Sequence, residues 1–521
     1  MISVTSPAMT GPASHTADPD LLDEDLERVL DRAGAAAPIL AEASIEDRAV
    51  ALVAIADALD VHRAELVAAA RAETGLPGAR LAGELTRTCV QLRMFAQEVR
   101  AGAFLDVVVD RADPQFVLGP RPELRRYQIP VGPVLVFAAS NFPFAFSVAG
   151  ADTAAALAAG CAVILKAHPG HPRTSELTAT VVREALASVD VPDGAFALIT
   201  GVRSGTRALQ DPRVAAAAFT GSVAGGRALF DIAAARPNPI PFYGELGSIN
   251  PVVITRGALD ERLDEIATGF VGSFTLGTGQ FCTKPGLLLV PAGSAVVDRI
   301  AELTAQVAET RMLTSKITQG YRARLDTVSG VAGVEVLVTG TGAETQDGDT
   351  DTVPTVSPSL LLAPIAQLDE TSTLLEESFG PAAVIAEYHS DDDVEKVLTH
   401  IQGTLTVTLH VAARPSADEV EQVRAWGRLA ATRAGRVVFN GWPTGVAVTP
   451  AQHHGGPYPA TTAIAHTSVG TAAIRRFLRP VVYQDAPDEV LPPAVQDANP
   501  LRVPRVINEA GESGTWGHHP G

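Results

Sequence analysis

Val131-Gly-Pro-Val-Leu-Val-Phe-Ala-Ala139 and Cys161-Ala-Val-Ile-Leu165 are the two stretches of this chain that decide its fold. Each is a near-continuous apolar run of strand length, and a small-residue stretch with helical character, residues 148–159, lies between them. Strands that are apolar on both faces and alternate with helices are typical of a parallel sheet covered on both sides. The sequence therefore predicts a doubly wound α/β domain.

The same alternation continues on both sides of these two stretches. Residues 21–101 show helical spacing, and Ser44-Ile-Glu-Asp47 has the spacing of a capping box at a helix start. We assign residues 21–249 to a dinucleotide-binding domain that follows a flexible leader, residues 1–20. Further strands are predicted at 195–200 and 215–220, and helices at 175–187 and 205–209.

A second α/β pattern occupies residues 250–450, which we assign to a catalytic domain. Its predicted strands are 287–290, 383–388, 405–411 and 437–440, its helices 260–276 and 417–431, and a surface loop is expected at 340–354. Residues 451–521 are predicted to be a return segment and an oligomerisation tail. We expect the tail after about residue 475 to combine with residues 120–130 in a small β element that adds to a neighbour's sheet.

Composition excludes several classes of function. The formal net charge of −19 argues against nucleic acid as a partner, because phosphate binding needs clustered Lys and Arg. No apolar run is long enough for a spanning helix, so we expect no membrane association. Cys89, Cys161 and Cys282 form no CxxC pair, so we expect no disulfide framework, no metal site and a reducing cytoplasm.

Two residues stand where covalent chemistry is possible. Cys282, in Gly279-Gln-Phe-Cys-Thr-Lys-Pro285, follows a predicted helix end at 270–276 and lies in an irregular turn, where a thiol can approach a substrate. The alternative for such a residue is a buried structural cysteine. Glu245 lies between glycines in Phe242-Tyr-Gly-Glu-Leu-Gly-Ser248, and its alternative is an exposed loop acid.

Three further positions follow predicted strands, at the edge where open α/β sheets bind ligands. Asn141 follows the first strand and has an amide that can donate to an oxyanion, although Asn is also a common turn residue. Lys166 ends the second strand. Gly221-Ser-Val-Ala-Gly-Gly226 links a strand to a helix and can point amides at a phosphate, but it lacks the GxGxxG fingerprint.

Taken in order, these segments resemble the aldehyde dehydrogenase superfamily. The resemblance covers about residues 21–483, and it implies the fold of that superfamily: a doubly wound cofactor domain, an α/β catalytic domain and a small β oligomerisation element. The matching motifs are Asn-Phe-Pro at 141–143, Lys166, Phe-Thr-Gly-Ser at 219–222, Glu-Leu-Gly at 245–247, Gly-Gln-x-Cys-Thr at 279–283 and Glu-x-Phe-Gly-Pro at 377–381.

Narrower segments are similar to the NADP-preferring branch that contains the α-ketoglutarate semialdehyde (2,5-dioxovalerate) dehydrogenases. They are Lys166-Ala-His-Pro-Gly-His-Pro172, Asn440-Gly-Trp-Pro-Thr-Gly445, His454-Gly-Gly-Pro-Tyr-Pro-Ala-Thr461 and Arg475-Arg-Phe-Leu-Arg-Pro480. The resemblance implies an enzyme that oxidises this semialdehyde to 2-oxoglutarate. Medium- or long-chain aliphatic aldehydes are the alternative substrates, and a catalytically silent binding relative is the alternative class.

The resemblance also implies catalytic roles. Cys282 would attack the aldehyde carbon, and the side chain of Asn141 with the Cys282 amide would stabilise the oxyanion. After hydride transfer Glu245 would activate the water that hydrolyses the thioester. A separate base for water is also sensible chemically, and its presence argues against a CoA-acylating enzyme.

The remaining roles implied by the resemblance concern the cofactor. Lys166 and Glu377 would hold its two ribose groups, Phe379 would pack by the nicotinamide, and Ser222 in the turn from Gly221 to Gly226 would meet the pyrophosphate. Leu246 is also expected to bind the cofactor. Pro169 stands where NAD-preferring members carry Glu, so that no carboxylate repels a 2′-phosphate. His168 and Arg203 would supply positive donors, which favours NADP, with NAD as the alternative.

The substrate pocket is the least determined part of the prediction. Phe144, Phe281 and the loop 453–458 are expected to shape it, and the arginine that would bind a distal carboxylate is not identified by the sequence. The small-molecule aldehyde is the expected partner, together with further copies of the chain in a homodimer or homotetramer.

Overall fold

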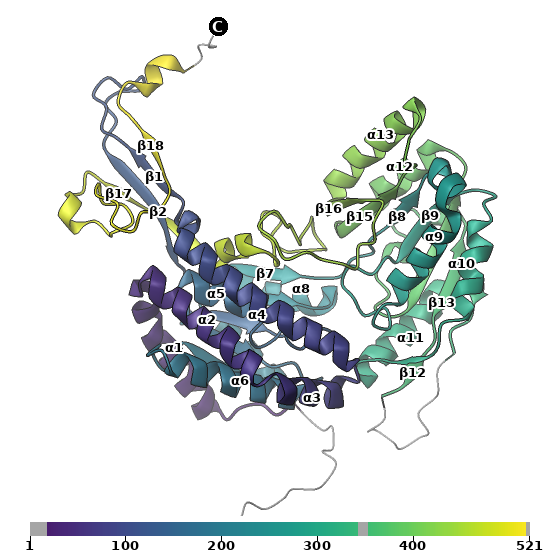
Figure 1. The fold of residues 1–521 in the computed structure, drawn as a ribbon, viewed down its shortest axis with the longest axis horizontal. Helices are drawn as coiled ribbons and strands as arrows, with labels where there is room; N and C mark the ends of the chain where they lie inside the picture. The colour runs from purple at the N-terminus through teal and green to yellow at the C-terminus, as the bar shows by residue number, and fades with distance from the viewer. Residues whose placement is uncertain (1–17, 342–352, 517–521) are drawn as a thin grey trace, which may run out of the picture.

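The computed structural model describes residues 18–341 and 353–516. The predicted leader therefore lies outside the described residues up to residue 17, and the predicted surface loop lies outside them from 342 to 352. The described chain begins with the helices α1 (Asp23–Glu42), α2 (Ile45–Val61), α3 (Arg63–Thr74) and α4 (Gly78–Ala101). α2 and α4 lie side by side (Figure 1). α2 begins at the predicted capping motif, where the Ser44 hydroxyl accepts a hydrogen bond from the Asp47 amide at 3.0 Å.

A five-stranded parallel sheet follows, with strand order β5-β4-β3-β6-β7. Its strands are β3 (Val134–Phe137), β4 (Val163–Lys166), β5 (Phe196–Ile199), β6 (Ala216–Thr220) and β7 (Phe242–Glu245), and its helices are α5 (Ala151–Ala159), α6 (Pro172–Ala187), α7 (Val202–Gln210) and α8 (Val223–Ala234). The chain runs from β3 to β5 on one side and from β6 to β7 on the other, so the topological switch point lies between β3 and β6. The predicted doubly wound fold is confirmed.

A seven-stranded sheet forms the second lobe, with strand order β11-β13-β14-β9-β8-β15-β16. All neighbouring strands are parallel except β11 and β13, and apolar clusters fill both faces. The strands are β8 (Val252–Ile254), β9 (Leu287–Pro291), β11 (Glu335–Val338), β13 (Ser359–Ala363), β14 (Ala382–Tyr388), β15 (Thr404–His410) and β16 (Ala434–Phe439), and β10 (Thr310–Arg311) pairs separately with β12 (Thr355–Val356). The helices are α9 (Arg256–Thr275), α10 (Val296–Ala305), α11 (Ser315–Ser329), α12 (Asp391–His400) and α13 (Ala417–Arg433).

Four strands of these two sheets were not predicted as strands: β7, β8, β13 and the four-residue edge strand β11. β7 contains Gly244 and lacks a continuous apolar run, and β8 is only three residues long and follows Pro251. β13 is a short run bounded by Pro358 and Pro364. Each is recruited by pairing with longer neighbours, which a local pattern does not reveal.

A third sheet of four strands, with order β17-β2-β1-β18, projects from the body of the molecule (Figure 1). Its strands are β1 (Val107–Asp110), β2 (Leu124–Pro130), β17 (Leu478–Gln484) and β18 (Arg505–Asn508). Residues near 125 are thus joined to the tail after 475, because β2 and β17 pair over seven residues. The side chain of Arg125 is buried against the chain that follows β17 and donates to Asp488 at 3.0 Å and to the Val495 carbonyl at 2.7 Å.

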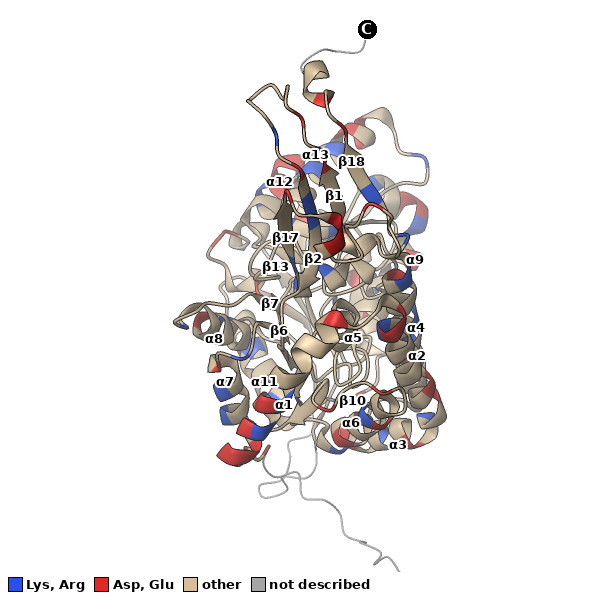
Figure 2. Cartoon of the chain, turned by 90° about the vertical axis from the view of Figure 1, so that its left-hand side faces the viewer, with Lys and Arg blue, Asp and Glu red and all other residues tan. Residues whose placement is uncertain are grey.

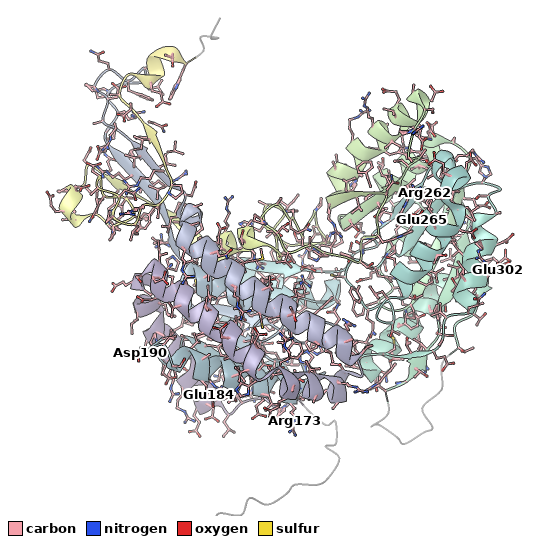
Figure 3. All side chains as sticks on the ribbon, in the orientation of Figure 1. Arg173, Glu184, Asp190, Arg262, Glu265 and Glu302 are labelled. Carbon is pink, nitrogen blue, oxygen red and sulfur yellow. The ribbon has the colours of Figure 1, made fainter. Side chains whose placement is uncertain are left out.

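The surface mixes charges of both signs. In Figure 2 acidic and basic residues alternate over the helices. Arg173, Glu184 and Glu302 lie on the outer faces of the two lobes (Figure 3), and all three are exposed. Within residues 18–341 and 353–516, every helix is too short or too polar to cross a membrane.

Candidate active site

The ends of four neighbouring strands bring the predicted residues of the first domain together. Lys166 ends β4 and Glu245 ends β7, while Asn141 follows β3 and Ser222 follows β6. In the sheet, Lys166 lies opposite Phe137 of β3, and Glu245 lies opposite Thr220 of β6. Because parallel strands present their carboxyl ends at one edge, these side chains share the crevice at the switch point.

Cys282 reaches this crevice from the second lobe. After α9 the chain passes through Gly277, Thr278 and Gly279, which have φ angles of 58°, 60° and 63°. Such left-handed backbone favours glycine, and a Cβ on Gly279 would also lie only 2.2 Å from the carbonyl oxygen of Gly380. Gly279 therefore allows the segment that carries Glu377 and Phe379 to pack directly on the cysteine loop.

Two asparagine side chains hold the cysteine loop in place. Asn250 Nδ2 donates to the carbonyl oxygens of Cys282 at 2.8 Å and Lys284 at 3.0 Å. Asn141 Nδ2 donates to the Gln280 carbonyl at 3.0 Å. The predicted oxyanion donor and the predicted nucleophile are thus joined across the interface between the two lobes.

Glu245, His454 and Cys282 form one connected group. His454 Nε2 lies 2.9 Å from Glu245 Oε1 and 3.5 Å from Cys282 Sγ, and the Ser468 hydroxyl donates to Glu245 Oε2. Glu245 and His454 are both buried, and Cys282 is partly exposed. Glu245 is therefore a buried, fully hydrogen-bonded carboxylate and not an exposed loop acid.

His454 is the residue of this group that the sequence analysis missed. The loop 453–458 was expected to shape the pocket, but no role was given to the imidazole. The return segment runs along the end of β7, where the Leu246 amide donates to the Ala460 carbonyl at 2.8 Å, and this contact carries His454 to the site. The signal available in the sequence was the motif His454-Gly-Gly-Pro-Tyr-Pro-Ala-Thr461, which begins with this histidine, but its place between Cys282 and Glu245 became clear only with the fold.

Burial and charge set the protonation of the group. Burial raises the pKa of the Cys282 thiol well above its ordinary value, and the Glu245 charge raises it further. Burial also opposes ionisation of Glu245, but His454, Ser468 and Cys282 outweigh it, so that the pKa of Glu245 lies below its ordinary value. At neutral pH the proton thus stays on sulfur, beside an ionised carboxylate that can accept it.

The same three donor atoms are close enough for a metal ion. Glu245, Cys282 and His454 each offer one ligand atom, and these atoms lie within 4.8 Å of one another. Such a mixed set of sulfur, nitrogen and oxygen is of the kind that Zn²⁺ accepts. The expectation that the protein has no metal site is not tested by this geometry.

Lys166 is held by the end of the predicted leader. Asp18 forms an ion pair with Lys166 Nζ, and its other oxygen accepts from the Gly201 amide at 2.8 Å. Asp20 accepts from the Ser204 amide at 3.0 Å. Lys166 and the amides at the start of α7 thus hold carboxylates of the chain itself, and their contacts with a cofactor stay a prediction.

The second predicted ribose ligand, Glu377, lies beside Lys284 and the Glu245 segment. Burial raises the pKa of Glu377, while the Lys284 charge opposes this change. Lys284 Nζ donates to the carbonyls of Ser378 at 2.8 Å and Ala382 at 2.7 Å. A Cβ on Gly247 would lie 2.9 Å from the Glu377 carboxylate, so the glycine permits this contact.

His168 does not carry the positive charge that the sequence analysis expected. Burial, His171 and Lys166 hold its pKa well below the ordinary value, so it is neutral. Its Nδ1 accepts from the Gly170 amide at 3.0 Å, which leaves Nε2 as a hydrogen-bond donor. Arg203 is exposed at the start of α7, in an ion pair with Asp23.

The turn from Gly221 to Gly226 is explained in part by packing. Ser222 caps α8 by accepting from the Gly225 amide at 3.2 Å. A Cβ on Gly226 would lie 2.0 Å from a methyl group of Leu246, so only glycine lets Leu246 pack here. Cofactor contacts of these residues, and of the partly buried Phe379, stay predictions.

One predicted pocket residue lies elsewhere. Phe144 is 1% exposed and packs in the core under α4, because its amide is held by Glu84. The ring that meets Phe281 is that of Phe142, at a centroid distance of 5.2 Å. The aromatic wall beside Cys282 is therefore formed by Phe142 and Phe281, not by Phe144.

Comparison with known proteins decides the family. Residues 1–459 match the model of the aldehyde dehydrogenase family. This chain belongs to that family. The sequence-based recognition is confirmed, and the protein is an aldehyde dehydrogenase that uses a nicotinamide cofactor to oxidise an aldehyde to a carboxylic acid.

Two curated relatives are similar to this aldehyde dehydrogenase over nearly their whole length. It is 45% identical to alpha-ketoglutaric semialdehyde dehydrogenase 2 of Azospirillum brasilense, covering 94% of this chain and 92% of the relative. It is 41% identical to alpha-ketoglutaric semialdehyde dehydrogenase of Acinetobacter baylyi, covering 89% and 87%. Among solved structures, the NAD-dependent aldehyde dehydrogenase from Sinorhizobium meliloti superposes with a TM-score of 0.73 at 23% identity, covering 89% of this chain and 88% of that one. The likeness to this solved structure concerns the fold alone.

Proposed function

We propose that this aldehyde dehydrogenase oxidises α-ketoglutarate semialdehyde (2,5-dioxopentanoate) to 2-oxoglutarate and prefers NADP. The observation that carries the proposal is the group of Cys282, Glu245 and His454 in a chain whose two full-length relatives are named for this substrate. The reaction consumes one aldehyde, one water and one oxidised cofactor. It releases the acid, the reduced cofactor and a proton.

In the first step Cys282 attacks the aldehyde carbon as its proton passes to Glu245. Cys282 Sγ and a carboxylate oxygen of Glu245 lie within 4.8 Å of each other, and His454 Nε2 contacts both groups, so the proton has only a short distance to travel. Asn141 Nδ2 and the Cys282 amide stabilise the oxyanion of the resulting thiohemiacetal. The nicotinamide supplies the two-electron oxidation when bound, and the cysteine is left as a thioester.

Before the second step the proton taken from Cys282 leaves Glu245 for solvent, and the ionised carboxylate then acts as the base for water. Its Oε1 and Oε2 are held by His454 and Ser468, which fix the carboxylate and can pass the proton onward. Attack of the water on the thioester releases the acid and regenerates the cysteine. A CoA-acylating enzyme has no need of such a base, so Glu245 supports hydrolysis.

The preference for NADP is supported by the charges around the start of α7. Pro169 has no carboxylate that would repel a 2′-phosphate. Arg203 lies in the first turn of α7, next to the amides that donate to Asp18 and Asp20. A 2′-phosphate at this place would meet Lys166 and Arg203 together. NAD would use only the hydroxyl contacts.

Assembly into a homo-oligomer is part of the proposal. β16 is an edge strand, and beside it lies an apolar hollow of about 540 Å³ between α13 and β16. The projecting four-stranded sheet exposes Val482 on its edge strand β17. An edge of this sheet laid along β16 of a neighbour would cover both surfaces. Light scattering distinguishes the dimer from the tetramer.

The test measures formation of reduced nicotinamide with 2,5-dioxopentanoate and hexanal, each with NADP and NAD. We expect the highest kcat/KM with 2,5-dioxopentanoate and NADP. Cys282→Ala removes the nucleophile and should lower turnover at least about 10⁴-fold while cofactor binding persists. A higher kcat/KM with hexanal would instead favour an aliphatic aldehyde dehydrogenase. No turnover with any aldehyde by a folded protein that binds the cofactor would favour CoA-dependent or silent relatives.

A further inference from the structure

Two arginines of α4 lie against the aromatic wall beside the nucleophile. Arg80 and Arg87 are seven residues apart, which places them on one face of the helix. The Arg80 guanidinium carbon lies 5.2 Å from the ring centre of Phe142 and 4.9 Å from that of Phe281. The Arg87 guanidinium lies 5.9 Å from Phe142 and 5.4 Å from Phe146.

The two arginines differ in their hydrogen-bond partners. Arg80 donates to the Asn141 carbonyl oxygen at 2.7 Å, so it supports the loop of the oxyanion donor. Arg87 Nε is buried without an acceptor, and no hydrogen bond or ion pair of residues 18–341 and 353–516 uses the rest of its guanidinium. Burying a hydrogen-bond donor without an acceptor costs free energy. An unpaired guanidinium is therefore suited to bind an acceptor group of a ligand.

Glu84, the acid between the two arginines on α4, does not satisfy Arg87. Its Oε1 accepts from the amides of Phe144 at 2.8 Å and Ala145 at 3.0 Å, and its Oε2 is buried without a partner. The carboxylate therefore points to the chain after Asn141. It offsets part of the local positive charge but occupies none of the Arg87 donors.

The charge of Arg87 is felt at the reacting atoms. Burial and the charge of Glu245 raise the pKa of Cys282, and the charge of Arg87 opposes them by lowering it. Arg436 also interacts electrostatically with Cys282, but its two terminal nitrogens donate to the carbonyls of Gly445 at 2.9 Å and Pro443 at 2.6 Å. In Arg436 only Nε therefore lacks an acceptor, whereas none of the nitrogens of Arg87 has a hydrogen-bond partner among the described residues.

We propose that Arg87 is the anchor for the distal carboxylate of the substrate. The aldehyde carbon would lie at Cys282, the apolar chain along Phe142 and Phe281, and the carboxylate on the guanidinium of Arg87, whose planar fork matches a carboxylate. This assignment rests on the proposed function, since only a semialdehyde acid has a carboxylate to bind. It makes Arg87 a specificity-determining residue that takes no part in the bond changes.

The experiment compares 2,5-dioxopentanoate with pentanal, an uncharged aldehyde of the same length, in the wild type, Arg87→Gln and Arg87→Lys. We expect Arg87→Gln to raise KM for the acid substrate about 30- to 100-fold, because a hydrogen-bonded charge pair is lost. The value of kcat/KM for pentanal should change less than about threefold, since no charged contact is involved. Arg87→Lys should restore part of the affinity for the acid, because it keeps the charge without the fork.

Glutarate supplies a readout that does not depend on which aldehyde is the natural substrate. This five-carbon dicarboxylate should compete with pentanal in the wild type, and its inhibition constant should rise in Arg87→Gln in parallel with the KM of the acid. Arg100→Gln is the matched control on the same helix, because it removes only an exposed ion pair with Glu46. It should leave both substrates unchanged.

The outcomes separate this inference from the proposed function. Equal losses with both aldehydes, or no loss with either, would overturn the anchor role of Arg87. If the wild type oxidises pentanal but not 2,5-dioxopentanoate, the proposed function fails. In that case, glutarate that inhibits the wild type more strongly than Arg87→Gln would still show that Arg87 binds a carboxylate. Equal inhibition of the two proteins would overturn the anchor role of Arg87.

Discussion

The surroundings of Cys282 and of Lys166 are built in opposite ways. Around Cys282 the reacting groups contact one another directly, and backbone carbonyls and asparagines hold them in place. Around Lys166 the donors are engaged by Asp18 and Asp20, acids that come from the start of the described chain. Covalent chemistry needs a fixed geometry, whereas a cofactor that enters and leaves needs donors whose partners can be displaced.

Of the variants that test this difference, Glu245→Gln should have the largest effect on turnover. It keeps the shape of the group formed by Cys282, Glu245 and His454 and removes its base. Steady-state turnover should fall about 10²- to 10⁴-fold. The variant loses the acceptor of the Cys282 proton, but it also loses the charge that raises the pKa of this thiol, so thioester formation should suffer less than hydrolysis. Rapid mixing should therefore show a burst of reduced nicotinamide equal to the enzyme, followed by a slow phase. Linear progress at the wild-type rate would show that another group activates the water.

His454→Gln should have a smaller effect, about tenfold on kcat, since the imidazole orients the base without reacting itself. His454 is among the groups that hold the pKa of Glu245 below its ordinary value. The base is active above its pKa and is lost as pH falls through it. Removing the histidine raises that pKa, so the acidic limb of the kcat profile should move to higher pH. An unmoved limb in a slower variant would assign His454 a purely structural role.

Asp18→Asn should have the smallest effect and should act on the other region. The variant frees Lys166 from a competing carboxylate, so KM for NADP should fall about fivefold, which corresponds to about 1 kcal/mol. Because the catalytic group is untouched, kcat should stay the same. Asp193→Asn, which removes an exposed ion pair with Arg32, is the control. An increased KM for NADP would mean that Asp18 supports cofactor binding instead of opposing it.

The sequence predicted the glycine-rich turn that carries Cys282 and the strand that Asn141 follows. It placed Glu245 between glycines but did not predict β7, the strand that this residue ends. It did not predict the role of His454, because this residue is 172 residues from Cys282 and 209 from Glu245, and the motif that it begins does not connect it with either. Phe144 and Phe142 could not be told apart either. They stand two residues apart in the same loop, and only the hydrogen bond to Glu84 decides which ring turns into the core.

The leader shows a similar limit of sequence patterns. Its composition is typical of a flexible segment, yet the contacts of Asp18 and Asp20 depend on charges at the ends of β4 and α7. Likewise, the unpaired state of Arg87 is a property of the assembled site. No spacing along α4 distinguishes it from Arg80, which has a partner.

The projecting sheet has a consequence for synthesis of the protein on the ribosome. Arg125 of β2 and its partner Asp488 are 363 residues apart, so at about 5–20 residues per second the first two strands wait about 20–70 s for their neighbours. During that time their edges are open to pairing with other nascent chains. Arg125 can pair from the start with Glu123, two residues before it, while the donors that bind Asp488 and the Val495 carbonyl stay open until those residues arrive.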